Sequence, residues 1–184
     1  IMLGDADIAI GGGAECMSRG PYIVPAGRWG QRMGDMKAID MMVGALHDPF
    51  DVIHMGVTAE NVATKWGITR QEQDALAVES HRRAAAATKA GHFKSQIVPI
   101  EIKGKKGPTV FDTDEHFREG TSMDDMAKLR PVFAKENGTV TAGNASGIND
   151  GAGAVVLMER RMAEKRGLKP LARLVSYGHA GVDP

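Results

Sequence analysis

A run of small residues at positions 139–153, reading TVTAGNASGINDGAG, constrains this chain more than any other stretch. We expect none of these side chains to fill a hydrophobic core, and the glycines let a ligand or a second backbone approach closely. The apolar run 154–158 follows directly and is typical of a buried strand. A loop of small polar residues before such a strand can form the wall of a ligand site, or it can be a tight turn in which Asn, Asp and Gly only satisfy turn geometry.

Other local patterns predict an α/β chain. Thr69 and Glu72 have the spacing of a helix capping box and open an alanine-rich stretch that Gly91 ends, so we expect a long helix from about 70 to 90. A second helix is expected from about 54 to 66, with Gly67 as its end. The remaining expected elements are strands at 6–10, 97–102, 154–158 and 171–177, and short helices at 39–46, 122–129 and 159–167.

The charge balance disfavours nucleic acid as a partner, because the chain has 23 basic and 23 acidic residues and no net field to attract a polyanion. No apolar run approaches the length of a membrane span, and the first residues lack the basic and apolar regions of a signal peptide. The single cysteine, Cys16, excludes an internal disulfide and agrees with a reducing compartment. We therefore expect a soluble cytoplasmic protein that binds neither nucleic acid nor a membrane.

Three patterns suggest common kinds of site but do not match them in detail. Residues 11–13 are glycines after a strand, but the third glycine of a dinucleotide-binding turn is missing, and we expect a plain loop there. The acidic cluster 112–116 lacks the spacing of a calcium loop, and the 6 histidines show no metal-ligand spacing, so no metal site is expected. Cys16 beside a methionine is a nucleophile or a small buried side chain, and we favour the second.

Several strings together resemble the thiolase family, and most closely the bacterial beta-ketothiolases that act on short acyl-CoA chains. The matching strings are GGGAECMSRGPY, HMGVTAENVA, FREGTSMDDMAKLRPVF, TVTAGNASGINDGAGAVVLM and RLVSYGHAGVDP, in family order over essentially the whole chain. Each string alone is a modest match, but together they are highly specific. The departures are small, since Cys16 stands where Ser is usual and Gly153 where Ala is usual.

The resemblance implies a fold and a domain organisation. Thiolases have a layered αβαβα architecture of two similar halves, with a loop domain inserted into the first half, and here that fold is incomplete. The implied divisions are 1–18 and 146–168 for parts of the N-terminal half, 19–145 for the inserted loop domain, and 169–184 for the start of the C-terminal half. In the family the loop domain binds CoA and helps to build a homotetramer. Both ends of the chain look cut, so we expect an interior segment of a longer protein.

The resemblance also implies a reaction. Thiolases condense an acyl-CoA with acetyl-CoA, or cleave a 3-ketoacyl-CoA with free CoA, by acyl transfer through an activated cysteine. In the family the nucleophilic Cys precedes the segment that this chain resembles, and the Asn, the His and the second Cys of the active site follow it. We therefore expect no catalytic residue in this chain and no activity of the chain alone. The CoA thioester is the substrate, and no cofactor or metal is implied.

The run of small residues matches part of the family's CoA site. Ser146 matches the residue that hydrogen-bonds the pantetheine arm. The close-fitting wall implied around it consists of Ala142, Gly147 and Ile148. The resemblance therefore favours the ligand-wall interpretation of this run over the plain turn.

Four more residues match the family's CoA-binding positions. His54 and Met55 match residues that line the pantetheine and acyl end of the site, Arg118 the basic residue near the adenine and its phosphate, and Phe133 an apolar contact. From the residues alone, Met55 and Phe133 fit core packing equally well, and Arg118 fits a surface charge. Two other functions also stay open: a noncatalytic CoA- or lipid-binding protein of this fold, and an oligomerisation module.

Overall fold

The computed structural model describes residues 1–182 and divides the chain into two compact units. Residues 1–45 and 148–182 form the strand unit, and Leu46–Gly147 form the loop unit. The run of small residues therefore begins in the loop unit and ends in the strand unit. Residues 183 and 184, the last two of the predicted 169–184 segment, lie outside the described residues.

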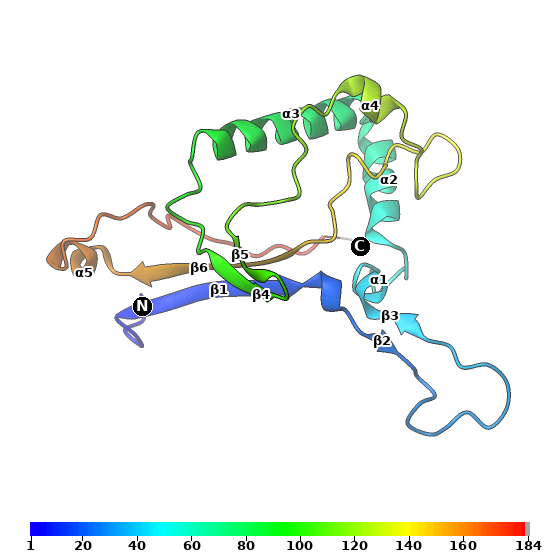
Figure 1. Cartoon of the computed structure of the whole chain (residues 1–184), viewed down its shortest axis with the longest axis horizontal. Coiled ribbons are helices and arrows are strands. Elements are labelled where there is room, and N and C mark those ends of the chain that lie inside the picture. The colour runs from blue at the N-terminus through cyan, green and yellow to red at the C-terminus, as the bar shows by residue number, and fades with distance from the viewer. Residues whose placement is uncertain (183–184) are drawn as a thin grey trace. The chain divides into compact units, whose positions relative to one another are not determined.

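The strand unit contains a long antiparallel pair, β1 (Ile8–Cys16) and β6 (Asp150–Met158), which lie side by side in Figure 1. This pair contains the predicted strands at 6–10 and 154–158, but the predicted loop at 11–13 is wrong. The strand continues through these glycines because ladder hydrogen bonds use only backbone groups. Gly12 and Gly13 face Ala154 and Gly153 on β6, which are equally small, whereas Gly11 faces Val155.

The side chains of this pair are more exposed than the sequence predicts. Val155 and Val156 are 60% and 62% exposed, and successive strand residues point to opposite faces, so neither face of β6 is covered by the described residues. The expected strand at 171–177 is also absent, and none of the described strands pairs with that segment. An apolar run acquires strand structure only when a partner supplies hydrogen bonds.

The smaller elements of the strand unit follow local signals. The predicted helix at 39–46 is split into a short strand and one helical turn, because Ile39 and Asp40 pair with an earlier strand. The predicted helix at 159–167 forms after Glu159, with Gly167 in the left-handed region just beyond its end. These elements are η1 (Met17–Arg19), β2 (Tyr22–Ile23), β3 (Ile39–Asp40), α1 (Met41–Ala45) and α5 (Arg160–Lys165).

Two helices dominate the loop unit, α2 (Met55–Trp66) and α3 (Arg70–Lys89), and both predicted helices are confirmed. The capping box of α3 is present: the Glu72 carboxylate accepts hydrogen bonds of 2.8 Å from the Thr69 amide and hydroxyl, and the Thr69 hydroxyl oxygen accepts one from the Glu72 amide. Gly67 ends α2 in the left-handed conformation. Both helices therefore begin and end where local chemistry specifies.

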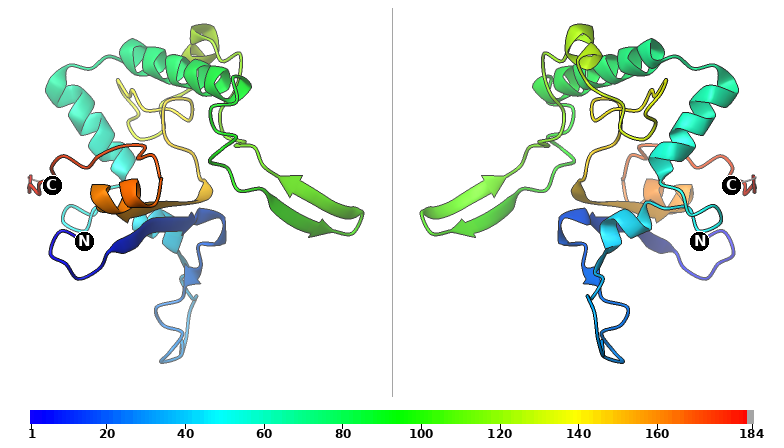
Figure 2. Two further views of the ribbon diagram at one scale, coloured as in Figure 1. Left: turned by 90° about the vertical axis from the view of Figure 1, so that its left-hand side faces the viewer. Right: turned by 90° about the vertical axis from the view of Figure 1, so that its right-hand side faces the viewer.

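The rest of the loop unit is a hairpin, a short helix and a long irregular segment. The hairpin pairs β4 (Ile100–Gly104) with β5 (Gly107–Phe111) and extends away from α3 (Figure 2). Its first strand begins after Pro99, whose missing N–H cannot join the ladder. The short helix α4 (Met123–Ala127) begins at Ser122, whose hydroxyl oxygen accepts a hydrogen bond from the Asp125 amide.

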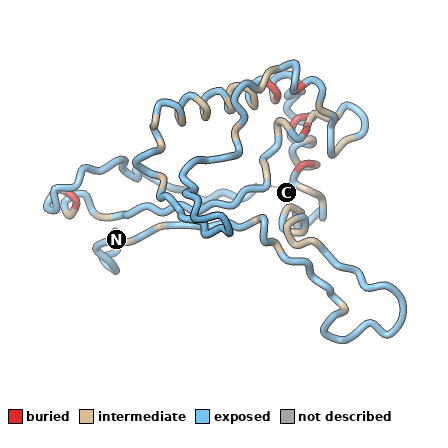
Figure 3. Tube along the Cα trace, viewed as in Figure 1, coloured by how far each residue is buried: buried red, intermediate tan, exposed pale blue. Residues whose placement is uncertain are grey.

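The core of the loop unit gathers where α2, the start of α3 and α4 meet (Figure 3). Ala63, Met126 and Val140 are its buried apolar residues, at most 6% exposed, so the expectation that nothing in the run 139–153 fills a core is wrong for Val140. Two polar residues are buried with them: Asp74 is 3% exposed and Thr141 is fully buried. Because a buried polar group is costly without hydrogen bonds, these two indicate an internal polar network.

Candidate functional site

His54 begins α2 and is held by local hydrogen bonds. Its Nδ1 accepts a hydrogen bond of 2.9 Å from the Gly56 amide, as a helix N-cap does. The chain before it is closed by two backbone hydrogen bonds, from the Met55 amide to the Leu46 carbonyl and from the Asp48 amide to the Ile53 carbonyl. The imidazole therefore has a defined position at the first turn of the helix.

Phe133 packs against this turn from a distant part of the loop unit. Its ring stacks on His54 with the ring centroids 4.7 Å apart and the planes inclined by 24°. A Cβ atom at Gly56 would lie 2.1 Å from the Phe133 ring, so only glycine allows this approach. The structure thus brings His54 and Phe133, two of the residues predicted from the resemblance, into direct contact.

Met55 lies on the exposed side of the same turn. It is 41% exposed, so the alternative of a core residue does not apply to it. Its side chain borders a shallow apolar depression of about 400 Å³ along α2. The depression is lined by Met55, Thr58, Ala59, Val62, Ala63, Ile68 and Gln73.

Ser146 and Gly147 lie at the end of the loop unit, and Gly147 is packed against His116. Ser146 is exposed, and no hydrogen bond to its side chain is found within residues 1–182. A Cβ at Gly147 would lie 2.1 Å from the His116 ring, so this imidazole rests directly on the Gly147 backbone. From the sequence, His116 is expected only as part of an acidic turn, because no local pattern reports a contact with a distant segment.

Two carboxylates from different helices hold the segment before Ser146. Glu60 of α2 accepts hydrogen bonds of 2.9 Å from the amides of Thr139 and Val140, and one of 2.7 Å from the Thr139 hydroxyl. Burial raises the pKa of Glu60, but these hydrogen bonds outweigh it and leave the pKa below its usual value. Asp74 of α3 accepts a hydrogen bond of 2.9 Å from the Asn144 side chain. The sequence analysis identified neither carboxylate.

The three other predicted residues are Arg118, Ala142 and Ile148. Within residues 1–182 they make no hydrogen bond, ion pair or ring contact with His54, Phe133 or His116. Arg118 is exposed; its amide donates a hydrogen bond of 3.2 Å to Nδ1 of His81, and its guanidinium has no ion pair among the described residues. Ala142 is exposed in the turn after Thr141. Ile148 belongs to the strand unit and is 60% exposed. Likewise, no hydrogen bond or ring contact of residues 1–182 links Ser146 to His54 or Phe133.

Comparison with known proteins decides the family. Residues 1–161 match the family described as thiolase, N-terminal domain. The chain belongs to the thiolase family. It is 72% identical over 184 residues to beta-ketothiolase BktB of Cupriavidus necator, covering all of this chain and 47% of that protein. It is 55% identical over 188 residues to acetyl-CoA acetyltransferase of Paracoccus denitrificans, again covering all of this chain and 47% of the relative.

Solved thiolase structures share the fold. The crystal structure of the Bacillus anthracis acetyl-CoA acetyltransferase superposes with a TM-score of 0.91 at 47% identity, covering 98% of this chain and 46% of that one. The predicted α/β class and its identity as part of a thiolase fold are thereby confirmed. The chain spans about half the length of the curated thiolases that it matches.

Cys16 does not have the surroundings of an activated thiolase nucleophile. It ends β1, is exposed rather than buried as the sequence analysis favoured, and its Sγ lies 3.7 Å from a carboxylate oxygen of Asp150. The side-chain partner of this thiol is an acid, not one of the basic residues that activate a nucleophilic cysteine. Hydrogen bonds from the Ser18 hydroxyl and amide lower the pKa of Asp150 and keep this neighbour negatively charged.

Within residues 1–182, no three His, Cys, Asp or Glu side chains are grouped in a way that could hold a metal ion. Among the helices of the same residues, none combines the length and the apolar character that crossing a bilayer requires.

Proposed function

We propose that this chain is the acyl-CoA-binding part of a thiolase that condenses an acyl-CoA with acetyl-CoA or cleaves a 3-ketoacyl-CoA with free CoA. The observation that carries the proposal is the 72% identity to a beta-ketothiolase over the whole chain. The complete enzyme would supply the nucleophilic cysteine and the histidine from segments beyond these 184 residues. The CoA thioester is the substrate, and no separate cofactor takes part.

Ser146 is the central contact of the proposed site. Its hydroxyl is exposed and without an internal partner in the described chain, so it is available to hydrogen-bond an amide of the pantetheine arm. Ala142 and Gly147 are small and permit close approach of the arm, and Ile148 offers an apolar contact, as a fitted wall requires. The two carboxylates that hold the preceding segment support a preformed surface at Ser146.

The remaining residues are proposed to bind the two ends of the substrate. His54, Met55 and Phe133 border the pantetheine and acyl end, and their support is the packed first turn of α2 with the exposed Met55 beside it. Arg118 contacts the adenine or its phosphate, which agrees with a guanidinium that is not engaged by an acid of the described chain.

The cellular setting is part of the same proposal. We propose a cytoplasmic homotetramer in which 1–18 and 146–168 are parts of the N-terminal thiolase half, 19–145 is the inserted loop domain and 169–184 is the start of the C-terminal half. A single cysteine agrees with a reducing compartment. The equal numbers of acidic and basic residues, 23 of each, give no electrostatic reason for a nucleic-acid partner.

Kinetics of Ser146→Ala in the complete enzyme test the proposal. Loss of one substrate hydrogen bond should raise the KM for CoA about fivefold in thiolysis, with kcat changed less than about twofold. Ser80→Ala, an exposed serine on α3, is the matched control and should leave both constants unchanged. An unchanged KM for Ser146→Ala would remove this residue from the site.

A further inference from the structure

The turn before Ser146 is closed by one asparagine side chain. Oδ1 of Asn144 accepts a hydrogen bond of 2.8 Å from the Thr141 amide, and the Ala145 amide donates to the Thr141 carbonyl at 3.1 Å. The Thr141 hydroxyl in turn accepts from the Gly143 amide at 3.2 Å. Because Thr141 is fully buried, the base of this turn is anchored in the core of the loop unit.

Asp74 ties this turn to the long helix α3. One carboxylate oxygen accepts from the Asn144 side chain at 2.9 Å, and the other accepts from Nε of Arg70 at 2.6 Å. A buried carboxylate is stable only when such hydrogen bonds replace its water. The Asp74 carboxylate therefore fixes the turn to α3, and both of its oxygens accept hydrogen bonds.

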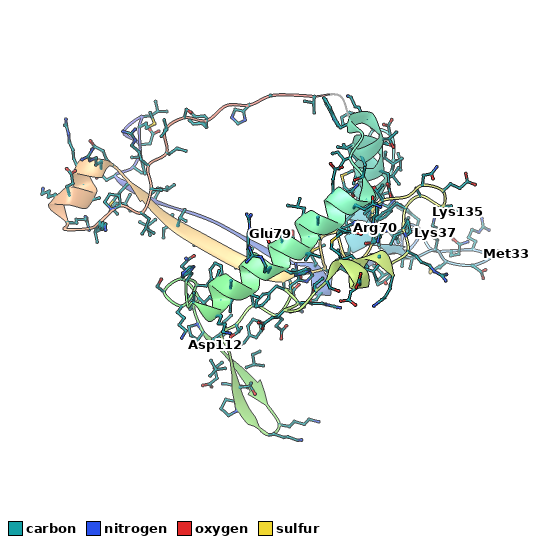
Figure 4. The ribbon with its side chains drawn as sticks, turned by 90° about the horizontal axis from the view of Figure 1, so that it is seen from above. Met33, Lys37, Arg70, Glu79, Asp112 and Lys135 are labelled. Atoms are coloured by element: carbon teal, nitrogen blue, oxygen red, sulfur yellow. The ribbon has the colours of Figure 1, made fainter. Side chains whose placement is uncertain are left out.

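Arg70 extends the same network to α4. Its Nη2 donates hydrogen bonds to the carbonyls of Met126 at 2.6 Å and Leu129 at 3.2 Å. Figure 4 shows Arg70 at the N-terminal end of α3, near α4, whereas Glu79 lies farther along the helix. The carboxylate thus joins two helices and the turn, and no residue of this network is itself a predicted CoA contact.

We propose that Asp74 is a positioning residue for acyl-CoA binding and acts through Asn144 on Ser146. This inference rests on the proposed role of Ser146, which follows Asn144 by two positions. The Ser146 side chain has no hydrogen bond of its own to any described residue, so the backbone of the turn sets where its hydroxyl points. A turn that is already fixed loses little conformational entropy when the substrate binds. We expect this to lower the KM for CoA.

The tethering hydrogen bond can be removed and restored by exchanging the two side chains. Asn144→Asp keeps the acceptor for the Thr141 amide, loses the donors to Asp74 and to the Thr139 carbonyl, and sets two carboxylates together. Asp74→Asn loses the charge that Arg70 and Asn144 share. The combined Asp74→Asn, Asn144→Asp protein again has one carboxylate and one amide in contact. Asn137→Asp, at an exposed position of the same unit, makes the same chemical change as a control.

The experiment measures thiolysis of acetoacetyl-CoA by the complete enzyme, with thermal unfolding followed for every variant. Asn144→Asp and Asp74→Asn should each raise the KM for CoA about fivefold and change kcat less than about twofold. The exchanged protein restores the contact between residues 74 and 144 but not the bond to the Thr139 carbonyl, so its KM should lie below that of either single variant, and Asn137→Asp should not differ from the parent. In a Ser146→Ala background, adding Asn144→Asp should raise KM less than about twofold further, because the contact it positions is already absent.

The outcomes separate the inference from the proposed function. If Ser146→Ala raises KM while Asn144→Asp leaves it unchanged, or if the two effects multiply in full, the positioning role is wrong and the CoA site stands. If Ser146→Ala itself has no effect on KM, both the site and the positioning role fail. Should Asp74→Asn prevent folding, the Asn144→Asp and Ser146→Ala pair still decides, since Asn144 is only half-buried.

Discussion

The two units of this chain are stabilised in different ways. In the strand unit, β1 and β6 pair over nine residues through backbone hydrogen bonds, and nearly all their side chains are exposed. In the loop unit, buried side chains from separate helices converge on one irregular segment. Backbone pairing tolerates many side chains, whereas a buried polar network does not. Substitutions should therefore affect stability more in the loop unit than in the strand unit.

The largest effect is expected at Asp74. Asp74→Ala leaves the partly buried Arg70 guanidinium and the Asn144 amide without their partner, and should lower the free energy of unfolding by about 3 kcal/mol. Asp150→Ala is the comparison in the strand unit, because that carboxylate is exposed and bonds Ser18. Urea unfolding of the complete enzyme measures both variants. Equal losses for the two would break the contrast between the units.

A smaller effect is expected at Gly56. A methyl group there would meet the Phe133 ring at 2.1 Å, so Gly56→Ala should destabilise the protein by about 2 kcal/mol. Gly44→Ala in α1 of the strand unit makes the same change with its nearest neighbouring atom at 3.8 Å. That control should be neutral or slightly stabilising, since alanine favours helix. Thermal unfolding that ranks the two glycines the other way contradicts the packing described for the loop unit.

The pH dependence at Glu60 sharpens the contrast further. Its pKa is lowered in the folded state, so its contribution is complete above the unfolded pKa and is lost as the pH falls through the folded value. Part of the stability that the wild-type protein loses as the pH falls below about 5 should come from this group. In Glu60→Gln this part of the slope should disappear. The denaturant midpoints of both proteins are measured at pH 7 and pH 4. An equal change in midpoint between these pH values for the two proteins would exclude the hydrogen bonds from Thr139 to Glu60.

The smallest effect is expected at Cys16 of the strand unit. The thiol is exposed beside a carboxylate, and we assign it no part in acyl transfer. Cys16→Ser should leave kcat and KM of the complete enzyme within about twofold of the parent, since it removes no proposed contact. Loss of thiolysis in this variant would make Cys16 the nucleophile and overturn the assignment of catalysis to other segments.

The sequence predicted structure best where the determining contacts are local. The bounds of α2 and α3 follow from the capping pattern at Thr69 and from Gly67, because these signals act within one helical turn. The continuation of β1 through the glycines and the missing strand at 171–177 depend on whether a partner strand is present. The residues of one strand do not show whether a partner strand is present.

The candidate site likewise contains residues that the sequence predicted and contacts that it did not. Ser146, His54 and Phe133 were found through their resemblance to thiolase motifs, and their roles stay predictions. The clamps on this segment join residues 79 and 70 positions apart, Glu60 with Thr139 and Asp74 with Asn144. His116 on Gly147 is a contact of the same kind. No periodicity or spacing rule reports such pairs, so only the folded chain reveals them.

A structure of the complete enzyme with CoA bound tests the central claim most directly. We expect the Ser146 hydroxyl within about 3.2 Å of an amide nitrogen or oxygen of the pantetheine arm, with the Asp74 and Asn144 side chains still hydrogen-bonded. Binding of CoA at a surface that excludes Ser146, or a turn released from Asp74 in the complex, would contradict the account.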